Sequence, residues 1–224
     1  MLFGFTDIIP PLGQAPFEVS AALNEGDVLV VRGPSGAGKT TLLRILARLT
    51  SAGSGEVFLQ GKNWRDIPAT GWRSAVHYMS QRPALFDGTA AANLSKPFEL
   101  RALSSKKFDS DRAKALLEEL LLGPNIWNND ARTLSGGEAA RLAFVRALLL
   151  EPKVLLLDEP TAALDGKARD AFYRVLGRWL EAGGRTAVLV SHADDYTGIE
   201  RVCYLDINPE RVGNKDAAIC NTNL

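Results

Sequence analysis

The stretch that decides the fold is Gly33-Pro34-Ser35-Gly36-Ala37-Gly38-Lys39-Thr40. It matches the pattern of a phosphate-binding loop, in which glycines let the backbone wrap around phosphate oxygens and direct N–H groups at them. The apolar run at 28–31 predicts a buried strand before the loop, and apolar residues at helical spacing over 42–49 predict a helix after it. This order of strand, glycine loop and helix predicts a site for a nucleoside triphosphate.

The loop chemistry predicts a role for individual side chains. Lys39 is expected to reach the β- and γ-phosphates, and the Thr40 hydroxyl is expected to ligate Mg²⁺. The helix that begins near Lys39 adds the positive end of its dipole. The predicted nucleotide-binding residues of this segment are Gly33, Pro34, Ser35, Gly36, Ala37, Gly38, Lys39, Thr40 and Thr41.

A pair of acids follows the most apolar run of the chain. Residues 154–157 are valine and leucine, and Asp158-Glu159 comes next. Because ligands of open α/β sheets lie at the carboxyl ends of the strands, both acids are expected beside the phosphate loop. Asp158 is the predicted Mg²⁺ partner, and Glu159 is predicted to polarise the attacking water. Taken alone, the pair also fits a solvated acidic turn.

Composition limits the classes of function. The chain has 224 residues, enough for one large α/β domain, and its 26 basic residues balance 26 acidic ones, which argues against a nucleic-acid-binding surface. The longest apolar stretches have strand length, so we expect no membrane-spanning segment and no secretion signal. Cys203 and Cys220 show neither metal-ligand spacing nor a disulfide-rich pattern, and both are expected to be free thiols.

The most discriminating segment is Leu134-Ser135-Gly136-Gly137-Glu138. Ser135 and Glu138 form a capping box at a helix start, and the glycines expose N–H groups that can face an anion. Between the phosphate loop and Asp158, the segment resembles the signature of the ATP-binding cassette (ABC) family, which most often has Gln where this chain has Glu138. The resemblance implies that four residues contact the γ-phosphate of ATP bound to a second copy: Ser135, Gly136, Gly137 and Glu138.

Other positions follow the family pattern in chain order. Gln81 resembles the glutamine that joins the core to the helical subdomain and senses Mg²⁺ and the attacking water, which implies catalytic and metal roles. Asp165 ends a segment that resembles the loop that crosses the dimer interface. His192 resembles the histidine that contacts the γ-phosphate. The family often stacks adenine on an aromatic residue near the N-terminus, and the best candidate is Phe5, with Phe3 behind it. Each of these residues also fits a purely structural role, as a strand end, a helix cap or an aromatic ring in the core.

The fold expected from these patterns is of the α/β class. Strands alternating with helices imply a mainly parallel sheet, here in a P-loop NTPase core with an N-terminal antiparallel β subdomain. Residues from about 88 to 135 are rich in Ala, Leu, Lys and Glu and predict an inserted α-helical subdomain. We expect residues 1–224 to form a single ABC ATPase domain.

The resemblance covers the chain from about residue 3 to 206 and implies the ATPase subunit of an ABC transporter. It implies ATP and Mg²⁺ as cofactors, a homodimer in the ATP-bound state, an integral membrane subunit as partner, and a cytoplasmic place on the inner face of the cell membrane. A groove near Gln81, with residues 82–87, is expected to hold a helix of that partner. The segment 81–89 resembles exporter-type cassettes, and the compact chain is similar to the ATPase of bacterial iron-export systems.

Two alternatives to a transporter subunit stay open at this point. One is a soluble cassette ATPase that does not transport, such as an assembly or nucleic-acid maintenance factor. The other is a phosphate-loop kinase, which gives no role to the segment 135–138.

Overall fold

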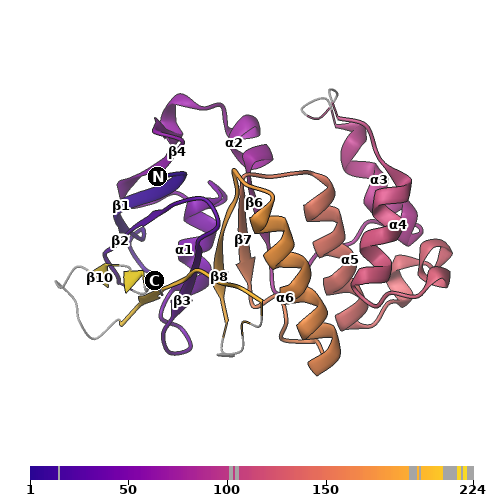
Figure 1. Cartoon of the computed structure of the whole chain (residues 1–224). Helices are drawn as coiled ribbons and strands as arrows, with labels where there is room; N and C mark the ends of the chain where they lie inside the picture. The colour runs from indigo at the N-terminus through magenta and orange to yellow at the C-terminus, as the bar shows by residue number, and fades with distance from the viewer. Residues whose placement is uncertain are drawn as a thin grey trace.

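The computed structural model describes residues 1–14, 16–100, 103, 106–191, 196 and 198–208, together with the backbone of 216–217 and 219–220. Two sheets and a group of helices make up these parts (Figure 1). The larger sheet lies in the middle, the smaller sheet lies on the side of the N-terminus, and the helical group lies on the opposite side.

The larger sheet has the strand order β11-β9-β3-β8-β7-β6, and all its neighbours are parallel except β11 and β9. Strands β7 and β8 are buried along their whole length. Parallel strands covered on both faces show continuous apolar runs, which is why these strands are visible in the sequence. The strands are β3 (Val28–Arg32), β6 (Val76–Met79), β7 (Val154–Asp158), β8 (Thr186–Val190), β9 (Val202–Asp206) and β11 (Ile219–Cys220).

The smaller sheet has the order β10-β2-β1-β4-β5, and β1 pairs antiparallel with both β2 and β4. Phe3 and Phe5 of β1 lie in the core that this sheet shares with α1 and α2. The Phe3 ring lies 6.3 Å from the ring of Trp72. The strands are β1 (Phe3–Ile9), β2 (Val19–Leu23), β4 (Ser54–Leu59), β5 (Lys62–Asn63) and β10 (Asp216–Ala217).

The helices cover the larger sheet and form the separate group. Helices α5 and α6 pack on one another through Phe144 and Phe172, whose ring centroids are 4.0 Å apart. In the group, α3 and α4 pack against α5. The α-helices are α1 (Lys39–Leu46), α2 (Ala69–Ala75), α3 (Ala90–Ser95), α4 (Ser110–Glu119), α5 (Gly136–Leu149) and α6 (Gly166–Glu181), and the 3-10 helices are η1 (Trp64–Asp66), η2 (Lys96–Glu99), η4 (Pro124–Asn128) and η5 (Ala131–Thr133).

The expected fold class is confirmed: a mainly parallel sheet, an antiparallel sheet that begins at the N-terminus, and helices between β6 and β7. In the described part of the chain, no helix has both the length and the apolar character needed to cross a membrane.

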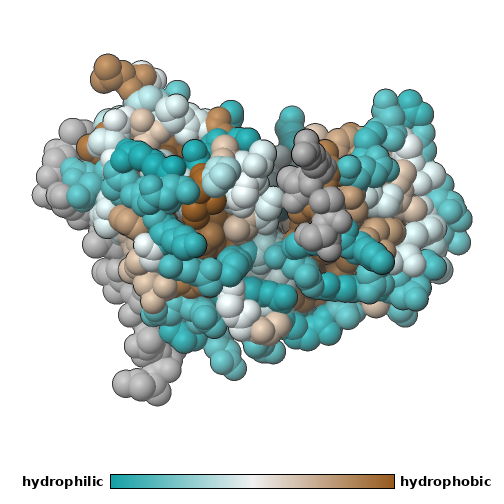
Figure 2. Space-filling model, turned by 90° about the horizontal axis from the view of Figure 1, so that it is seen from above, coloured by the Kyte–Doolittle hydropathy of each residue, from teal (hydrophilic) through white to brown (hydrophobic). Residues whose placement is uncertain are grey.

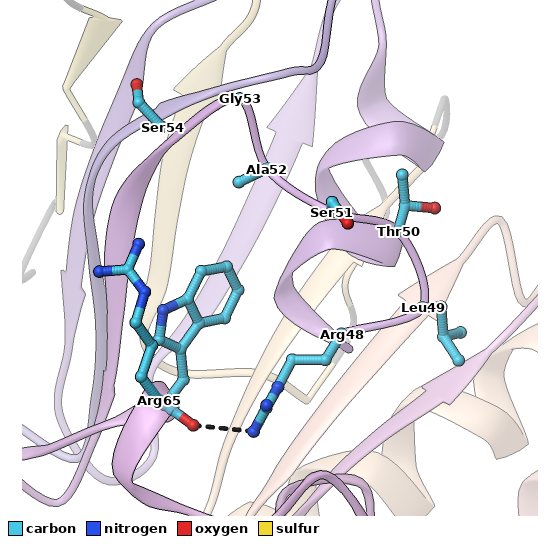
Figure 3. Close-up of a pocket in the computed structure, with 9 residues that line it drawn as sticks. Arg48, Leu49, Thr50, Ser51, Ala52, Gly53, Ser54 and Arg65 are labelled. Carbon is cyan, nitrogen blue, oxygen red and sulfur yellow. Dashed lines mark hydrogen bonds between the residues drawn. The ribbon is translucent and has the colours of Figure 1, made fainter.

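The end of α1 opposite the phosphate loop is fixed to the chain that follows β5. Arg48 donates from its guanidinium to the carbonyls of Trp64, at 2.8 Å, and Ile67, at 2.6 Å. The partners of the first bond, Arg48 and Trp64, both line a hollow of about 390 Å³, together with residues 49–54 and Arg65 (Figure 3). These two bonds tie the C-terminal end of α1 to the segment of η1 that follows the antiparallel sheet.

The expectation for Cys203 is wrong, because the residue is disulfide-bonded in the structure. Its backbone pairs with that of Cys220, where β11 runs antiparallel to β9. The pairing of β11 with β9 is a tertiary contact, and the spacing of two cysteines in a sequence does not encode it.

Candidate functional site

The phosphate loop joins β3 to α1 and needs glycine at several positions. A Cβ on Gly33 would lie 2.4 Å from the carbonyl oxygen of Ile207, so a larger residue does not fit there. Gly38, the residue before α1, has φ of 96°, a left-handed value that glycine adopts without strain. The loop therefore brings backbone N–H groups and the N-terminal end of α1 to one place, which suits an anion.

Lys39 is the cation of this loop. Its side chain is largely buried, and Nζ donates to the carbonyl oxygens of Gly33, at 2.8 Å, and Pro34, at 2.9 Å. These bonds hold the ammonium group across the loop. An ammonium group at this position has the charge and the reach to bind phosphate oxygens, and the role of Lys39 stays a prediction.

Asp158, at the end of β7, lies beside the loop and is buried. Its Oδ1 accepts a hydrogen bond from the Thr40 hydroxyl at 3.1 Å, and its Oδ2 accepts one from the Tyr78 hydroxyl at 3.0 Å. The hydroxyl of Thr40 and the carboxylate of Asp158 are hard oxygen donors, and Mg²⁺ uses one or two such protein groups together with substrate phosphates. The residues present therefore fit a Mg²⁺ site.

Tyr78 was not among the residues predicted from the sequence. Burial, followed by the charge of Asp158, raises the pKa of its phenol well above the usual value, so the hydroxyl stays a neutral donor. The available signal was its position in β6, the strand that pairs with β7: Tyr78 pairs with Leu156, close to the end where Asp158 lies. A tyrosine within an apolar strand does not suggest a role without that pairing.

Glu159 follows Asp158 and lies next to Gln81. The Gln81 amide donates from Nε2 to Glu159 Oε2 at 2.8 Å, so the structure brings together two residues of the predicted catalytic set. Glu159 has φ of 47°, an unusual value for a residue with a side chain, and its N–H donates to the carbonyl of Val190 at 2.9 Å. Left-handed backbone at such a position is frequent at functional sites. His192, the third residue of the set, lies outside the described residues.

The signature segment forms the predicted capping box at the start of α5. The Ser135 backbone N–H donates to Glu138 Oε2 at 2.9 Å, the Ser135 hydroxyl donates to the same oxygen at 2.8 Å, and the Glu138 N–H donates to the Ser135 hydroxyl at 3.3 Å. The bonds from the Ser135 backbone and hydroxyl lower the pKa of Glu138, which stays ionised near neutral pH. Glutamate therefore caps the helix at the position where the family most often has glutamine.

Asp165 lies next to this helix start. Its carboxylate caps α6 by accepting the Ala168 N–H at 2.9 Å. Residues 135–137 and 163–165 line one hollow of about 370 Å³, and none of the residues that line it belongs to the phosphate loop. The two predicted interface segments are thus adjacent in this chain, whereas the phosphate loop lies elsewhere.

Replacement of Gly137 by alanine is expected to destabilise the protein. A Cβ at Gly137 would lie 2.8 Å from the carbonyl oxygen of Ala163, whereas one at Gly136 would lie 3.7 Å from the Ala163 Cβ, an ordinary contact. Overpacking of this kind costs about 1–3 kcal/mol. Thermal unfolding should therefore show a lower Tm for Gly137→Ala than for the matched Gly136→Ala, and equal Tm values would contradict the close approach.

The expectation that Phe5 stacks on adenine is wrong. Phe5 is 1% exposed and Phe3 is 0% exposed, so neither ring offers a face to a ligand. The physical reason is the position of β1, which lies between β2 and β4 and turns both rings into the core with Trp72.

Comparisons with known proteins give a consistent result. The family model described as "ABC transporter" matches residues 17–162. The chain is 35% identical over 176 residues to the molybdate/tungstate import ATP-binding protein WtpC of Thermococcus kodakarensis, a match that covers 79% of this chain and 52% of that protein. It is 38% identical over 178 residues to the spermidine/putrescine import ATP-binding protein PotA of Nitrosospira multiformis, covering 79% and 48%.

A third relative is matched over more of its length. The chain is 33% identical over 177 residues to the probable iron export ATP-binding protein FetA of Escherichia coli, with coverage of 79% of this chain and 77% of FetA. The chain spans about half the length of the first curated relatives it matches. Among solved structures, the dimeric post-hydrolysis state of the ATP-binding cassette MJ0796 bound to ADP and Pi has a TM-score of 0.78 at 26% identity, covering 95% of this chain and 97% of that one.

Proposed function

The chain belongs to the family of ABC transporter ATPases, and from this premise we propose that it binds and hydrolyses ATP to power transport through a separate membrane subunit. The observation that carries the proposal is the cluster at one edge of the parallel sheet. There Lys39 lies in the phosphate loop, Thr40 bonds to Asp158, and Gln81 bonds to Glu159. The cluster contains a phosphate-binding cation, hard oxygen donors and a base, which are the groups that hydrolysis of a triphosphate needs.

In the proposed reaction, Lys39 and the N–H groups of the loop bind the β- and γ-phosphates. Thr40 and Asp158 would hold Mg²⁺, which supplies charge neutralisation on the phosphates when bound. Glu159 accepts a proton from the attacking water, whose oxygen bonds to the γ-phosphorus while the bond to the β–γ bridging oxygen breaks. Gln81 orients Glu159 through the hydrogen bond from its Nε2.

The second half of each site is proposed to come from another copy of the chain. None of the described residues that line the hollow formed by 135–137 and 163–165 belongs to the phosphate loop, so the two predicted halves of the site do not share this hollow within one chain. The capped N-terminus of α5 offers N–H groups to an anion. The related cassette MJ0796 is dimeric, which supports a dimer of this chain.

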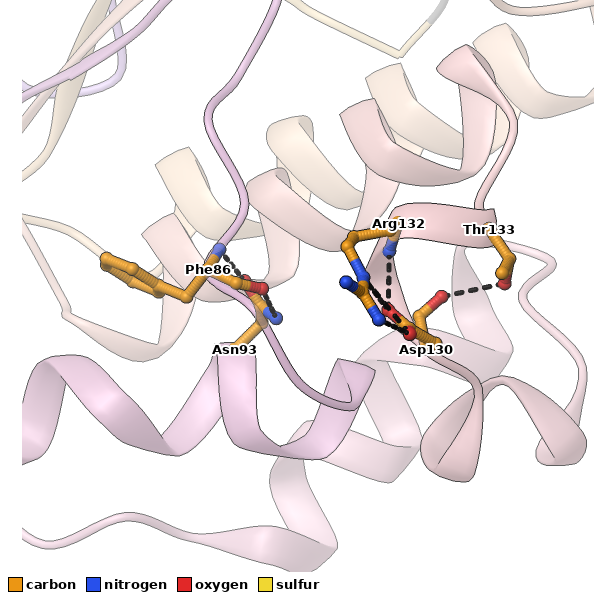
Figure 4. A network of polar contacts seen from close by, with 5 residues as sticks. All are labelled: Phe86, Asn93, Asp130, Arg132 and Thr133. Carbon is orange, nitrogen blue, oxygen red and sulfur yellow. Dashed lines mark hydrogen bonds and ion pairs between the residues drawn. The ribbon is translucent and has the colours of Figure 1, made fainter.

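An apolar groove supports the proposed membrane partner. The hollow, about 420 Å³, is lined by residues of α2 and β6, by Phe86, and by residues of the helical group. Asn93, fully buried, holds Phe86 by accepting its N–H at 2.7 Å and donating to its carbonyl at 2.8 Å (Figure 4). Phe86 is 43% exposed, so an apolar ring is presented to solvent on a fixed backbone. Figure 2 views the molecule from above and shows brown, apolar residues between teal, polar ones.

The charges of this groove favour an acidic helix as its occupant. Among the described residues that line the groove are Arg73 and Arg146, and none of these described residues is an acid. Burial, with a smaller effect of Arg146, lowers the pKa of His77 to about 4, so His77 is neutral near pH 7. We place here a helix of the membrane subunit that carries a carboxylate. Phe86 belongs to the predicted segment 82–87 and lines the groove, whereas Gln81 does not line it.

The proposed cargo is a metal ion, with iron export as the specific proposal. The support is the match to FetA, which extends over 77% of that protein, against 52% of WtpC and 48% of PotA. The proposed location is the cytoplasmic face of the cell membrane. ATP-dependent efflux of iron from cells that express the chain with the membrane protein of the neighbouring gene would support the proposal, and unchanged iron content with transport of another solute would overturn the cargo.

The variant Phe86→Asp is expected to weaken binding of the membrane subunit. A carboxylate in the groove removes the apolar contact, and affinity should fall at least tenfold, about 1.4 kcal/mol. The measurement is recovery of the co-expressed membrane subunit on an affinity-tagged chain in detergent. The matched control is Leu121→Asp, because Leu121 is 53% exposed and does not line the groove. Equal recovery with both variants would contradict the docking site.

A further inference from the structure

One residue, Tyr78, takes part in both the nucleotide site and the proposed docking groove. Its hydroxyl donates to Asp158 Oδ2 at 3.0 Å, beside the phosphate loop. Tyr78 is also one of the residues that line the groove of about 420 Å³ in which we place a helix of the membrane subunit. A single side chain in β6 therefore connects the two places.

On the nucleotide side, two hydroxyls hold the carboxylate of Asp158. Thr40 of α1 donates to Oδ1 at 3.1 Å, and Tyr78 of β6 donates to Oδ2. Asp158 is buried, so the loss of either donor leaves a carboxylate oxygen without an equivalent partner. Groups that orient a metal ligand in this way typically change metal affinity or activity by about 10- to 100-fold when they are removed.

The position of Tyr78 is fixed at the backbone and at the ring. In the parallel pairing of β6 with β7, Tyr78 lies opposite Leu156. The residue packs against the core that α1 shares with the smaller sheet. A tyrosine ring is rigid and turns about only two side-chain bonds, so its hydroxyl moves when the ring moves. A helix that fills the groove therefore contacts the residue that holds Asp158.

We propose that Tyr78 is a positioning residue that orients Asp158 for Mg²⁺ and passes occupation of the groove to the Mg²⁺ site. This inference rests on the proposed function and names the residue through which the membrane subunit regulates hydrolysis. A helix in the groove removes water from around Tyr78, and a hydrogen bond to a carboxylate is stronger in drier surroundings. Docking is thus expected to raise the affinity for Mg²⁺, and by linkage Mg²⁺ raises the affinity for the membrane subunit by the same factor.

The first test is Tyr78→Phe, which keeps the ring and removes the hydroxyl. The free Mg²⁺ concentration for half-saturation is measured twice, for binding of a non-hydrolysable ATP analogue and for ATP turnover. Both values are expected to rise by about 10- to 100-fold. Affinity for the analogue in EDTA should stay unchanged, because Lys39 and the glycine loop are intact. A purely structural role would lower Tm without changing the Mg²⁺ dependence.

The matched control is Tyr204→Phe, which removes a hydroxyl from β9 of the same sheet, at a residue that does not line the groove. It should leave the Mg²⁺ dependence unchanged. Equal Mg²⁺ dependence of Tyr78→Phe and Tyr204→Phe would overturn the positioning role.

The second test adds the membrane subunit encoded by the neighbouring gene, copurified in detergent. The wild-type chain with this subunit should need about fivefold less Mg²⁺ for half-saturation than the chain alone, a typical coupling between two sites. Tyr78→Phe should show no such difference. A wild type without the difference, or a difference that persists in Tyr78→Phe, would overturn the coupling. A wild type that binds no ATP, or does not recover the membrane subunit, would instead overturn the proposed function.

Discussion

Replacement of Glu159 by glutamine is expected to lower ATP turnover by about 10²- to 10⁴-fold, the contribution of a general base. Glutamine keeps the shape of the side chain but cannot take a proton from water. The groups that hold the phosphates, Lys39 and the glycine loop, are unchanged, so ATP affinity should be retained. The measurement is steady-state phosphate release together with equilibrium binding of MgATP.

The matched control for this variant is Glu118→Gln, an exposed glutamate of α4. Turnover by Glu159→Gln at the level of this control would remove Glu159 from the proposed mechanism. Because ATP stays intact in the slow variant, the proposed dimer should accumulate and be visible by light scattering. A variant that stays monomeric with ATP, both alone and with its membrane subunit, would contradict the site shared between two copies.

Replacement of Lys39 by alanine is the second change with a large expected effect. Removal of one preorganised donor from a transition-state site costs about 10²- to 10³-fold in kcat. In this chain the loss should also weaken nucleotide binding, since Lys39 is the cation held across the phosphate loop by the carbonyls of Gly33 and Pro34. Turnover and MgATP affinity are measured together, and both should fall.

Two further variants make this result specific. Lys62→Ala removes an exposed lysine in β5 and should leave turnover unchanged. Lys39→Arg keeps the charge, but the planar guanidinium does not replace a compact ammonium group, so activity should stay low. Full ATP binding by Lys39→Ala would show that the loop does not bind phosphate in the proposed way.

The elements that could be predicted from the sequence are those whose signal is local. The buried strands β3 and β7 are continuous apolar runs, and the capping box at Ser135 needs only its own four residues. The acids at 158 and 159 follow a strand, so their place at the sheet edge could be inferred before the structure. The same local signals could not show that Tyr78 bonds to Asp158, because the two residues lie on different strands.

The wrong predictions concern packing between distant segments. Phe5 is aromatic and lies near the N-terminus, as expected of a base-stacking residue, but the position of β1 between β2 and β4 buries its ring. Cys203 is disulfide-bonded, which the spacing of the cysteines in the sequence does not show. Likewise, Phe86 lines the groove and is held there by Asn93 of α3, a contact between the helix and the chain that follows β6.

The amino-acid sequence by itself determined the phosphate loop, the acids at the end of β7, the capped signature helix and the α/β class, because each depends on the backbone geometry and periodicity of neighbouring residues. Only the tertiary structure decided which side chains meet: Gln81 with Glu159, Tyr78 with Asp158, and Gln14 with Thr41. These pairs join segments that are far apart along the chain. Their meeting depends on strand order and packing, which no local pattern encodes.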